Sequence, residues 1–213
     1  MNTLFSQDNF KVKDLRNHIE ILRSIEDINE IKHEVDWNLE AAAYTRYSTE
    51  NNLPAPLFSN IKGVESGFRI LGAPAALSSN SDMPFARVAL SIGLSTMSTG
   101  KEIVDNLIST TYEKPVAPRV LDSIDAKVKE NILTGDLADL TKFPVPFVHK
   151  DDGNRYTNTY GIIIAQTPDG KWTNWSIARI MMIDGKNMTG LVMHPQHIAQ
   201  IWQKWELGFS RQF

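Results

Sequence analysis

The stretch from Trp172 to Arg179 holds the densest group of residues that could do chemistry. It reads Trp-Thr-Asn-Trp-Ser-Ile-Ala-Arg, so two tryptophans flank a polar pair and an arginine follows shortly after. The amide of Asn174 offers a carbonyl oxygen to a cation, and the guanidinium of Arg179 stays ionised at any working pH and can hold a carboxylate. The same pattern is typical of a half-buried strand with an exposed arginine, so the residues alone leave both interpretations open.

A second group runs from His194 to His197, as His-Pro-Gln-His. We expect Pro195 in the first turn of a helix, where neighbouring amides point toward whatever precedes the helix and anions commonly bind. His197 could ligate a metal together with Asn174, and a mixed oxygen and nitrogen donor set suits a hard divalent ion such as manganese better than zinc. Two ligands do not complete a site, however, and a lone histidine at a helix start is more often a capping or core residue.

Two strands joined by a tight turn are expected to carry the first group. Residues 157–166 are rich in β-branched and aromatic side chains, which favour a strand. The sequence Thr-Pro-Asp-Gly at 167–170 predicts a turn, because proline presets the bend and glycine tolerates positive φ. Residues 171–183 then return as a strand, 184–187 predict another turn, and 188–193 predict a third short strand.

Side-chain alternation along the strand at 171–183 divides the first group between two faces. One face carries Asn174, Ser176 and Ala178, and the other carries Trp175, Ile177 and Arg179. A site that uses both Asn174 and Arg179 therefore requires a bulge, a sharp twist or residues that leave the strand.

The first half of the chain is expected to be mainly helical. Apolar spacing predicts a helix at 13–24, which carries Leu15, Ile19 and Leu22, and then an irregular strand through Ile28, Ile31 and Val35. A helix capped by Asp36 or Asn38, a strand at 68–71 and a helix at 84–92 follow. Thr99 and Glu102 open a last helix with a capping box, and this helix is expected to turn Ile103, Val104, Leu107 and Ile108 inward. Pro115 and Pro118 interrupt this pattern and place a domain boundary at residue 118. Helices first and a meandering antiparallel sheet later predict an α+β protein.

Composition and charge exclude several classes of function. The 213 residues include no cysteine, so disulfides, zinc–thiolate sites, iron–sulfur clusters and thiol nucleophiles are impossible. A formal net charge of -3, with no dense basic run, argues against nucleic-acid binding. The first residues lack a signal-peptide pattern, and no apolar run approaches the roughly 20 residues that cross a bilayer. We expect a cytoplasmic protein with no membrane partner.

The stretch from Lys171 to Arg179 also resembles the cofactor-binding signature of fungal ferulic acid decarboxylases, which are members of the UbiD family. Thr-Gly-Leu-Val at 189–192 and Pro-Gln-His-Ile at 195–198 continue the similarity downstream. Upstream it includes Phe-Pro-Val-Pro at 143–146 and Asn-Leu-Pro-Ala-Pro-Leu-Phe at 52–58. The similarity spans nearly the whole chain up to Trp205.

This resemblance implies a reversible, non-oxidative decarboxylase of cinnamic-type acids such as ferulic, coumaric and cinnamic acid. It implies prenylated FMN as the cofactor, supplied by a flavin prenyltransferase, with manganese and potassium tying the cofactor phosphate to the protein. It also implies an α/β N-terminal domain at 1–118 and, at 119–213, the beginning of the split β-barrel that holds the flavin. The C-terminal domain through which the intact family forms homodimers would be absent.

The resemblance further assigns roles to individual residues. Asn174 and His197 would be manganese ligands, and the backbone carbonyl of Trp175 would bind potassium. Arg179 would be the catalytic residue, which holds the substrate carboxylate and stabilises charge as carbon dioxide departs. The flavin would be lined by Thr159, Ser176, Ile177, Ala178, Arg179 and Gln196, and the substrate pocket by Met193 and Gln196.

The family pairs its catalytic arginine with two downstream glutamates, one of which delivers the proton, and a further glutamate completes the metal site. The present sequence ends at Phe213, before any of them can be located. We therefore expect no decarboxylation by this chain alone. The alternative is a catalytically inactive flavin-binding or oligomerisation module that pairs with an intact paralogue.

Overall fold

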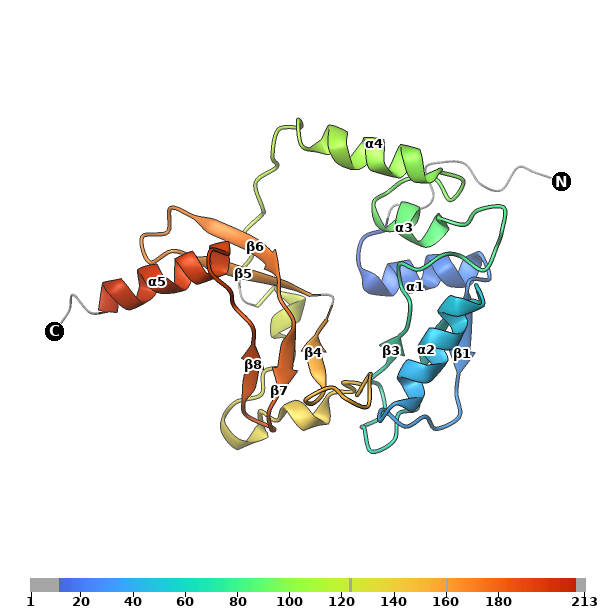
Figure 1. The fold of residues 1–213 in the computed structure, drawn as a ribbon, viewed down its shortest axis with the longest axis horizontal. Coiled ribbons are helices and arrows are strands. Elements are labelled where there is room, and N and C mark those ends of the chain that lie inside the picture. The colour runs from blue at the N-terminus through green and yellow to red at the C-terminus, as the bar shows by residue number, and fades with distance from the viewer. Residues whose placement is uncertain (1–11, 123, 160, 210–213) are drawn as a thin grey trace. The chain divides into compact units, whose positions relative to one another are not determined.

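The computed structural model describes residues 12–122, 124–159 and 161–209. The chain divides into two compact units, with the boundary between Thr134 and Gly135. Figure 1 traces the helices and strands of both units in chain order. Among the residues so described, no helix is both long and apolar enough to cross a membrane.

The first unit contains a small mixed sheet in the order β1–β2–β3, in which β1 and β2 run parallel and β2 and β3 run antiparallel. Its elements are α1 (Leu15–Ser24), β1 (Ile28–Ile31), α2 (Glu40–Glu50), β2 (Ala55–Phe58), β3 (Ile70–Leu71), α3 (Ala86–Ser91), α4 (Gly100–Thr110) and a 3-10 turn at Lys127–Lys129. Helix α2 lies in the crossover that two parallel neighbouring strands require.

The main core of this unit lies between the sheet and α2. Ile31, Ala41 and Phe58 are buried together there, and Val35 and Ile61 join them through an isolated parallel bridge. The predicted irregular strand is therefore confirmed only in part, because β1 ends at Ile31 and Val35 contributes a single bridge.

Helix α1 confirms the prediction from apolar spacing. The Asp14 carboxylate caps it by accepting a hydrogen bond of 2.7 Å from the backbone N–H of Asn17. Ile19 and Leu22 are buried, whereas Leu15 remains exposed.

The predicted cap of α2 is wrong. The helix begins at Glu40, and its N-cap is Leu39, which has a φ of 68° and no capping side chain. The carboxylate of Asp36 instead accepts hydrogen bonds from Lys62 Nζ and from the backbone N–H of Asn38. Both predicted caps thus belong to the loop that precedes the helix.

Helix α4 confirms the predicted capping box, because the Thr99 hydroxyl and the Glu102 carboxylate each bind the other residue's backbone N–H. The prediction that four aliphatic side chains turn inward is confirmed for one of them and wrong for the other three. Ile103 is buried, but Val104, Leu107 and Ile108 are about half exposed. The described residues of the first unit therefore cover only one side of this helix.

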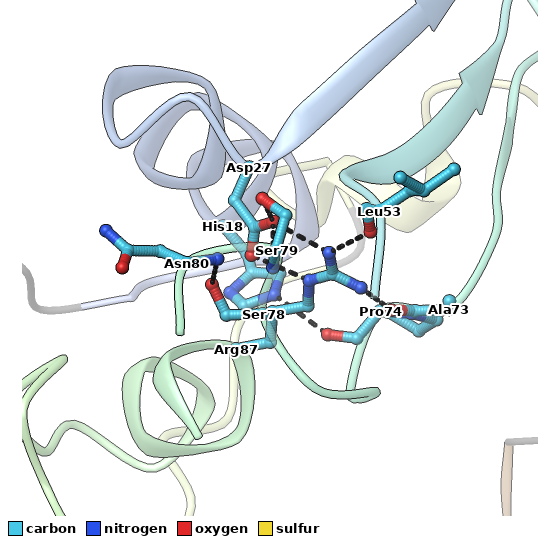
Figure 2. Close-up of polar contacts among 9 residues, drawn as sticks. All are labelled: His18, Asp27, Leu53, Ala73, Pro74, Ser78, Ser79, Asn80 and Arg87. Carbon is cyan, nitrogen blue, oxygen red and sulfur yellow. Dashed lines mark hydrogen bonds and ion pairs between the residues drawn. The ribbon is translucent and has the colours of Figure 1, made fainter. Parts of the chain in front are cut away.

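Asp27 and Arg87 form an ion pair in the interior of the first unit (Figure 2), and each side chain is only 1% exposed. Arg87 Nε and Nη2 donate to the two Asp27 carboxylate oxygens at 2.8 and 2.7 Å. Arg87 also donates to the carbonyl oxygens of Leu53 and Ala73, and Ser79 donates to Asp27 from both its amide and its hydroxyl. Burial alone would raise the pKa of the Asp27 carboxyl, but the hydrogen bonds from Arg87 and Ser79 outweigh burial and hold this pKa below its ordinary value.

His18 lies beside this ion pair and is buried with it (Figure 2). Its Nε2 lies 3.4 Å from the carbonyl oxygen of Pro74, and its Nδ1 has no hydrogen-bond partner among the described residues. Burial lowers the pKa of His18 below the ordinary value of 6.5, and the positive charge of Arg87 lowers it further against the opposing effect of the Pro74 hydrogen bond. The imidazole is therefore held in its neutral form.

The second unit consists of two small antiparallel sheets and one helix. Its sheets are β4–β7–β8 and the two-stranded β5–β6. Its elements are 3-10 turns at Gly135–Leu137 and Leu140–Lys142, β4 (Tyr156–Asn158), β5 (Ile162–Gln166), β6 (Thr173–Ile177), β7 (Ile180–Met182), β8 (Met188–Gly190) and α5 (His197–Phe209). Helices and mainly antiparallel sheets confirm the predicted α+β class.

Two of the predicted strands are each divided between the two sheets. The strand predicted at 157–166 becomes β4 and β5, and the one predicted at 171–183 becomes β6 and β7. The turn at 167–170 is confirmed, with Gly170 at a φ of 69° and its N–H bonded to the Thr167 carbonyl oxygen at 2.9 Å. The chain therefore enters the β5–β6 hairpin from the other sheet and returns to that sheet after it.

The start of α5 differs from the prediction. The helix begins at His197, so Pro195 lies before it and not in its first turn. Met193 and Gln196 close a turn over Pro195, because the Gln196 N–H donates to the Met193 carbonyl oxygen and the Met193 N–H donates to Gln196 Oε1. The predicted strand at 188–193 likewise ends early, at Gly190.

Candidate functional site

Asn174 and His197 meet where α5 packs against the β5–β6 hairpin (Figure 1). Asn174 lies in β6 and is 8% exposed, and His197 is the first residue of α5. The His197 Nδ1 and the Asn174 Oδ1 are 3.0 Å apart. The two candidate metal ligands, 23 residues apart in the chain, are therefore in direct contact.

The register of the hairpin explains why Asn174 faces the helix. Asn174 pairs with Ala165 and Ser176 pairs with Ile163, and both face the covered side of the hairpin. Trp175 lies opposite Ile164 on the other side, where its side chain is 65% exposed. The alternation predicted from the sequence is thus confirmed through the burial of successive side chains.

Two buried polar atoms on the covered side lack a partner. Asn174 Nδ2 and Ser176 Oγ are buried and form no hydrogen bond within the described part of the chain. Leaving a buried polar atom unpaired costs about 1–3 kcal/mol, so such atoms require an explanation. Their placement on one strand face, next to His197, is what a polar ligand would need.

Arg179 is presented differently, because it lies outside both sheets. Ala178 and Arg179 form the two-residue link between the end of β6 and the start of β7. Asn158 Nδ2 donates a hydrogen bond of 2.9 Å to the Ala178 carbonyl oxygen and so anchors this link. Of the bulge, the sharp twist and the exit from the strand that a site with both Asn174 and Arg179 could use, the structure shows the exit, because β6 ends at Ile177.

The exposed Arg179 guanidinium lies 5.8 Å from the centre of the Tyr156 ring, in cation–π range. Among the described residues, no carboxylate forms an ion pair with it, and neither Asn174 nor His197 forms a hydrogen bond with it. The structure therefore brings together the two candidate metal ligands, while it carries the candidate catalytic arginine on the neighbouring link.

The remaining candidate residues lie after β4, at the end of β6 and in the turn before α5. Thr159 is exposed in the bend after β4, and Gln196 lies in the turn before α5 together with the exposed Met193. Ile177 is the exposed last residue of β6. No group of three or more histidine or acidic side chains suited to a metal ion occurs in the described ranges.

Two further residues support the site and were not assigned a role from the sequence. Trp172 contacts the His197 ring, with ring centres 5.1 Å apart and planes at 74°. Asn158 is hydrogen-bonded to the Ala178 carbonyl oxygen in the link that carries Arg179. Its side chain lies against Gly161, where an added Cβ would collide with Asn158 Oδ1. The glycine at 161 is the feature of the sequence that could have pointed to Asn158, because a glycine near a strand often marks a place where another group approaches the backbone closely.

Two family models match this chain in succession. The 3-octaprenyl-4-hydroxybenzoate carboxy-lyase N-terminal domain of the UbiD family matches residues 19–107. The 3-octaprenyl-4-hydroxybenzoate carboxy-lyase Rift-related domain of the same family matches residues 119–211.

Similar proteins are named as decarboxylases. Ferulic acid decarboxylase 1 of Saccharomyces cerevisiae is 44% identical over 193 residues, which are 90% of this chain and 38% of that protein. Pyrrole-2-carboxylic acid decarboxylase of Pseudomonas aeruginosa is 42% identical over 192 residues, again 90% of this chain and 38% of the relative. The chain thus spans little more than a third of the length of these relatives.

Solved structures show the same fold. The vanillic acid decarboxylase of Sedimentibacter hydroxybenzoicus in its closed form superimposes with a TM-score of 0.80 at 23% identity, over 92% of this chain and 40% of that one. An evolved dimeric UbiD-class enzyme from Pelotomaculum thermopropionicum, in complex with prenylated FMN, gives a TM-score of 0.73 at 23% identity, over 91% of this chain and 41% of that one. With both family domains matched in order along the sequence, this chain belongs to the UbiD family.

Proposed function

We propose that this chain contributes the cofactor-holding part of a non-oxidative decarboxylase that acts on cinnamic-type acids with prenylated FMN. The names of the similar proteins and the prenylated FMN in a UbiD-class structure support the reaction type and the cofactor. The observation that carries the proposal is the contact of 3.0 Å between His197 Nδ1 and Asn174 Oδ1.

This pair fits a divalent cation such as manganese. An amide oxygen and an imidazole nitrogen form the mixed donor set that manganese accepts. Two adjacent ligands of an octahedral ion with bonds of about 2.1 Å lie about 3.0 Å apart, which agrees with the separation between His197 Nδ1 and Asn174 Oδ1. A direct hydrogen bond would have the same length. The unpaired Ser176 Oγ on the same strand face supports a bound polar group over a simple hydrogen bond.

The proposed cofactor site is built around this pair. The cation at Asn174 and His197, with potassium at the Trp175 carbonyl, would hold the phosphate of prenylated FMN. Thr159, Ser176, Ile177, Ala178 and Gln196 would line the flavin. When bound, the cofactor would accept the electron pair that the departing carboxyl group leaves behind.

Arg179 would bind the carboxylate of the substrate. Its guanidinium stays ionised, and the Tyr156 ring orients it without neutralising it. Since no carboxylate of the described residues pairs with it, its charge can serve a carboxylate that arrives with the substrate. Met193 and Gln196 would lie beside this substrate.

The proton for the decarboxylated carbon would have to come from elsewhere, because no acidic side chain in the described ranges pairs with Arg179. We expect the 213-residue chain, supplied with prenylated FMN, to give no turnover of cinnamic or ferulic acid above a flavin-only control. The proposal also includes domains at 1–118 and 119–213, a flavin prenyltransferase as cofactor source, cytoplasmic location and a homodimeric full-length protein.

A hybrid enzyme tests this function. The matching 193-residue stretch of the Saccharomyces cerevisiae relative is replaced by the corresponding residues of this chain and loaded with prenylated FMN. We expect the hybrid to decarboxylate ferulic or cinnamic acid, and Arg179→Ala to lower kcat by about 10²–10³-fold. Arg46→Ala, which removes an exposed arginine on α2, serves as the control. A folded, loaded hybrid that is unaffected by Arg179→Ala would refute the proposed role.

The alternative function, an inactive module that pairs with an intact paralogue, draws support from α4. The aliphatic side chains of Val104, Leu107 and Ile108 are about half exposed and lie in a row on this helix. Exposed apolar surface of this kind is typical of a site that binds another protein. Size-exclusion chromatography with light scattering distinguishes the two functions. A defined complex with a full-length relative favours the module, and its absence counts against it.

A further inference from the structure

We infer that Trp172 is a positioning residue for His197, because its indole holds the imidazole in the orientation that brings Nδ1 to Asn174. This inference rests on the proposed role of Asn174 and His197 as metal ligands. It goes beyond that role in naming what sets the geometry of the ligand pair.

The ring geometry is the first observation. The Trp172 and His197 ring centres are 5.1 Å apart, and their planes meet at 74°. Both values lie in the range in which aromatic rings attract one another edge to face. The contact is therefore a specific one, which disappears if the imidazole rotates about its side-chain torsions.

His197 needs such a contact because little else fixes its ring. It is the first residue of α5, and its side chain is exposed. Within the described ranges, its imidazole has a polar contact with Asn174 Oδ1 and a ring contact with the Trp172 indole. The contact with Asn174 fixes the position of Nδ1, and the contact with Trp172 fixes the plane of the ring. Together they select one rotamer of the His197 side chain.

Trp172 is itself well anchored. Its backbone N–H donates to Thr167 Oγ1 at 3.1 Å, and its carbonyl oxygen accepts from the Thr167 N–H at 2.9 Å. Thr167 is buried, and its hydroxyl also donates to Asp169 within the turn. The turn at 167–170 therefore fixes the point from which the indole extends.

A second residue of α5 also lies near the indole. Lys204 Nζ lies 5.6 Å from the centre of the Trp172 ring. His197 and Lys204 are seven residues apart, two helical turns, so they share one face of α5. The indole thus lies against both residues, and this double contact fixes the helix start as well as the imidazole.

The consequence concerns metal affinity. A ligating histidine binds best when its ring is oriented before the metal arrives, and partners that orient it raise the affinity. An edge-to-face contact of ordinary strength predicts that its loss weakens metal binding roughly 2- to 10-fold.

The test uses the full 213-residue chain and two readouts. Mn²⁺ is titrated in the presence of FMN, whose phosphate adds ligands, and free Mn²⁺ is measured from its electron paramagnetic resonance signal. Separately, the three-bond couplings of the His197 signals, which report its side-chain rotamer and do not depend on the Trp172 ring current, are recorded by NMR without metal. The variants are Trp172→Leu, which removes the aromatic ring, and Trp172→Phe, which keeps a smaller one.

We expect Trp172→Leu to weaken Mn²⁺ binding roughly 2- to 10-fold and to bring the His197 couplings toward values averaged over several rotamers, with Trp172→Phe restoring part of both effects. Two control variants are matched to it. Trp202→Leu removes an exposed tryptophan of α5, the helix that carries His197. Trp205→Phe removes the indole N–H that donates to the Gln166 carbonyl oxygen and so weakens the junction of helix and hairpin away from His197. Both are expected to leave Mn²⁺ affinity and the His197 couplings nearly unchanged.

The possible failures are separable. Unchanged His197 couplings in Trp172→Leu overturn the inference whatever the metal does, and so does unchanged Mn²⁺ affinity where the wild type binds. A loss of affinity equal to that of Trp205→Phe shows general destabilisation and also overturns it. A wild-type chain that binds no Mn²⁺ with FMN shows that Asn174 and His197 do not hold the ion without the family's further glutamate, and it overturns the metal function of Trp172 in the 213-residue chain. The NMR readout then still decides whether Trp172 orients the ring.

Discussion

The buried charges of Asp27 and Arg87 balance one another, so each side chain is stable in the interior only while the other is present. We predict that Asp27→Ala lowers the free energy of unfolding by about 3–5 kcal/mol, because it leaves the Arg87 guanidinium buried and uncompensated. Urea denaturation at neutral pH measures the effect. The control is Asp105→Ala, which removes an exposed pair with Lys101 and should change the unfolding free energy by about 0.5 kcal/mol or less. Similar losses for the two variants would contradict the prediction.

His18 makes a pH dependence expected at the scale of single residues. Because its folded pKa is below 6.5, the unfolded chain takes up a proton first as pH falls, so the protein loses stability below pH 6.5 and gains none above it. Asp27, whose folded pKa lies below 3.8, contributes stability above that value and loses it only at lower pH. Urea denaturation at pH 7.5 and 5.5 should therefore show a decline that His18→Leu reduces. An equal decline in both proteins would contradict the assignment to His18.

The sequence predicts residue-level features well where a side chain acts on near neighbours. The Thr99–Glu102 capping box and the turn that ends at Gly170 both follow from contacts within three positions. The Asp27–Arg87 pair is not predictable in this way, because 60 residues separate its members and neither has a local pattern that requires the other. The same holds for the contact between Asn174 and His197, which the donor chemistry of the two side chains and the family resemblance suggested and local spacing did not.

The link between β6 and β7 matters most at the scale of elements, because it carries Arg179. We predict that Gly161→Ala displaces Asn158, releases the Ala178 carbonyl oxygen and lowers kcat/KM of the hybrid enzyme by about 10- to 100-fold through misplacement of Arg179. Asn158→Ala should have a comparable effect. In the control, Gly100→Ala, the new Cβ would meet the Phe85 ring at an ordinary 3.4 Å. Full activity of Gly161→Ala would show that Asn158 does not hold the link.

Element boundaries show where sequence patterns lose their power. Strand alternation correctly divided Asn174 and Ser176 from Trp175, because successive side chains of a strand must point to opposite faces. The same pattern did not reveal that the chain passes from one sheet to the other after Ile177. Which sheet a short strand joins depends on the strands beside it, and these lie far away in the sequence.

At the scale of the whole molecule, the α+β class and the family follow from the sequence, whereas the exposure of aliphatic side chains does not. Periodicity predicted that Val104, Leu107 and Ile108 of α4 face inward, and it correctly found the apolar side of the helix. The structure buries Ile103 and leaves Val104, Leu107 and Ile108 about half exposed. An apolar stripe shows which side of a helix prefers a partner, but it does not show whether the same unit provides one.

The central claim is that Asn174 and His197 together hold the cation that fixes the cofactor phosphate. Its most direct test is the Mn²⁺ content of the hybrid enzyme loaded with prenylated FMN, measured by electron paramagnetic resonance alongside decarboxylation. Asn174→Ala and His197→Ala should each lose Mn²⁺ and activity together, while Trp202→Leu keeps both. If either ligand variant folds, retains Mn²⁺ at one ion per chain and decarboxylates at the unsubstituted rate, the claim is wrong.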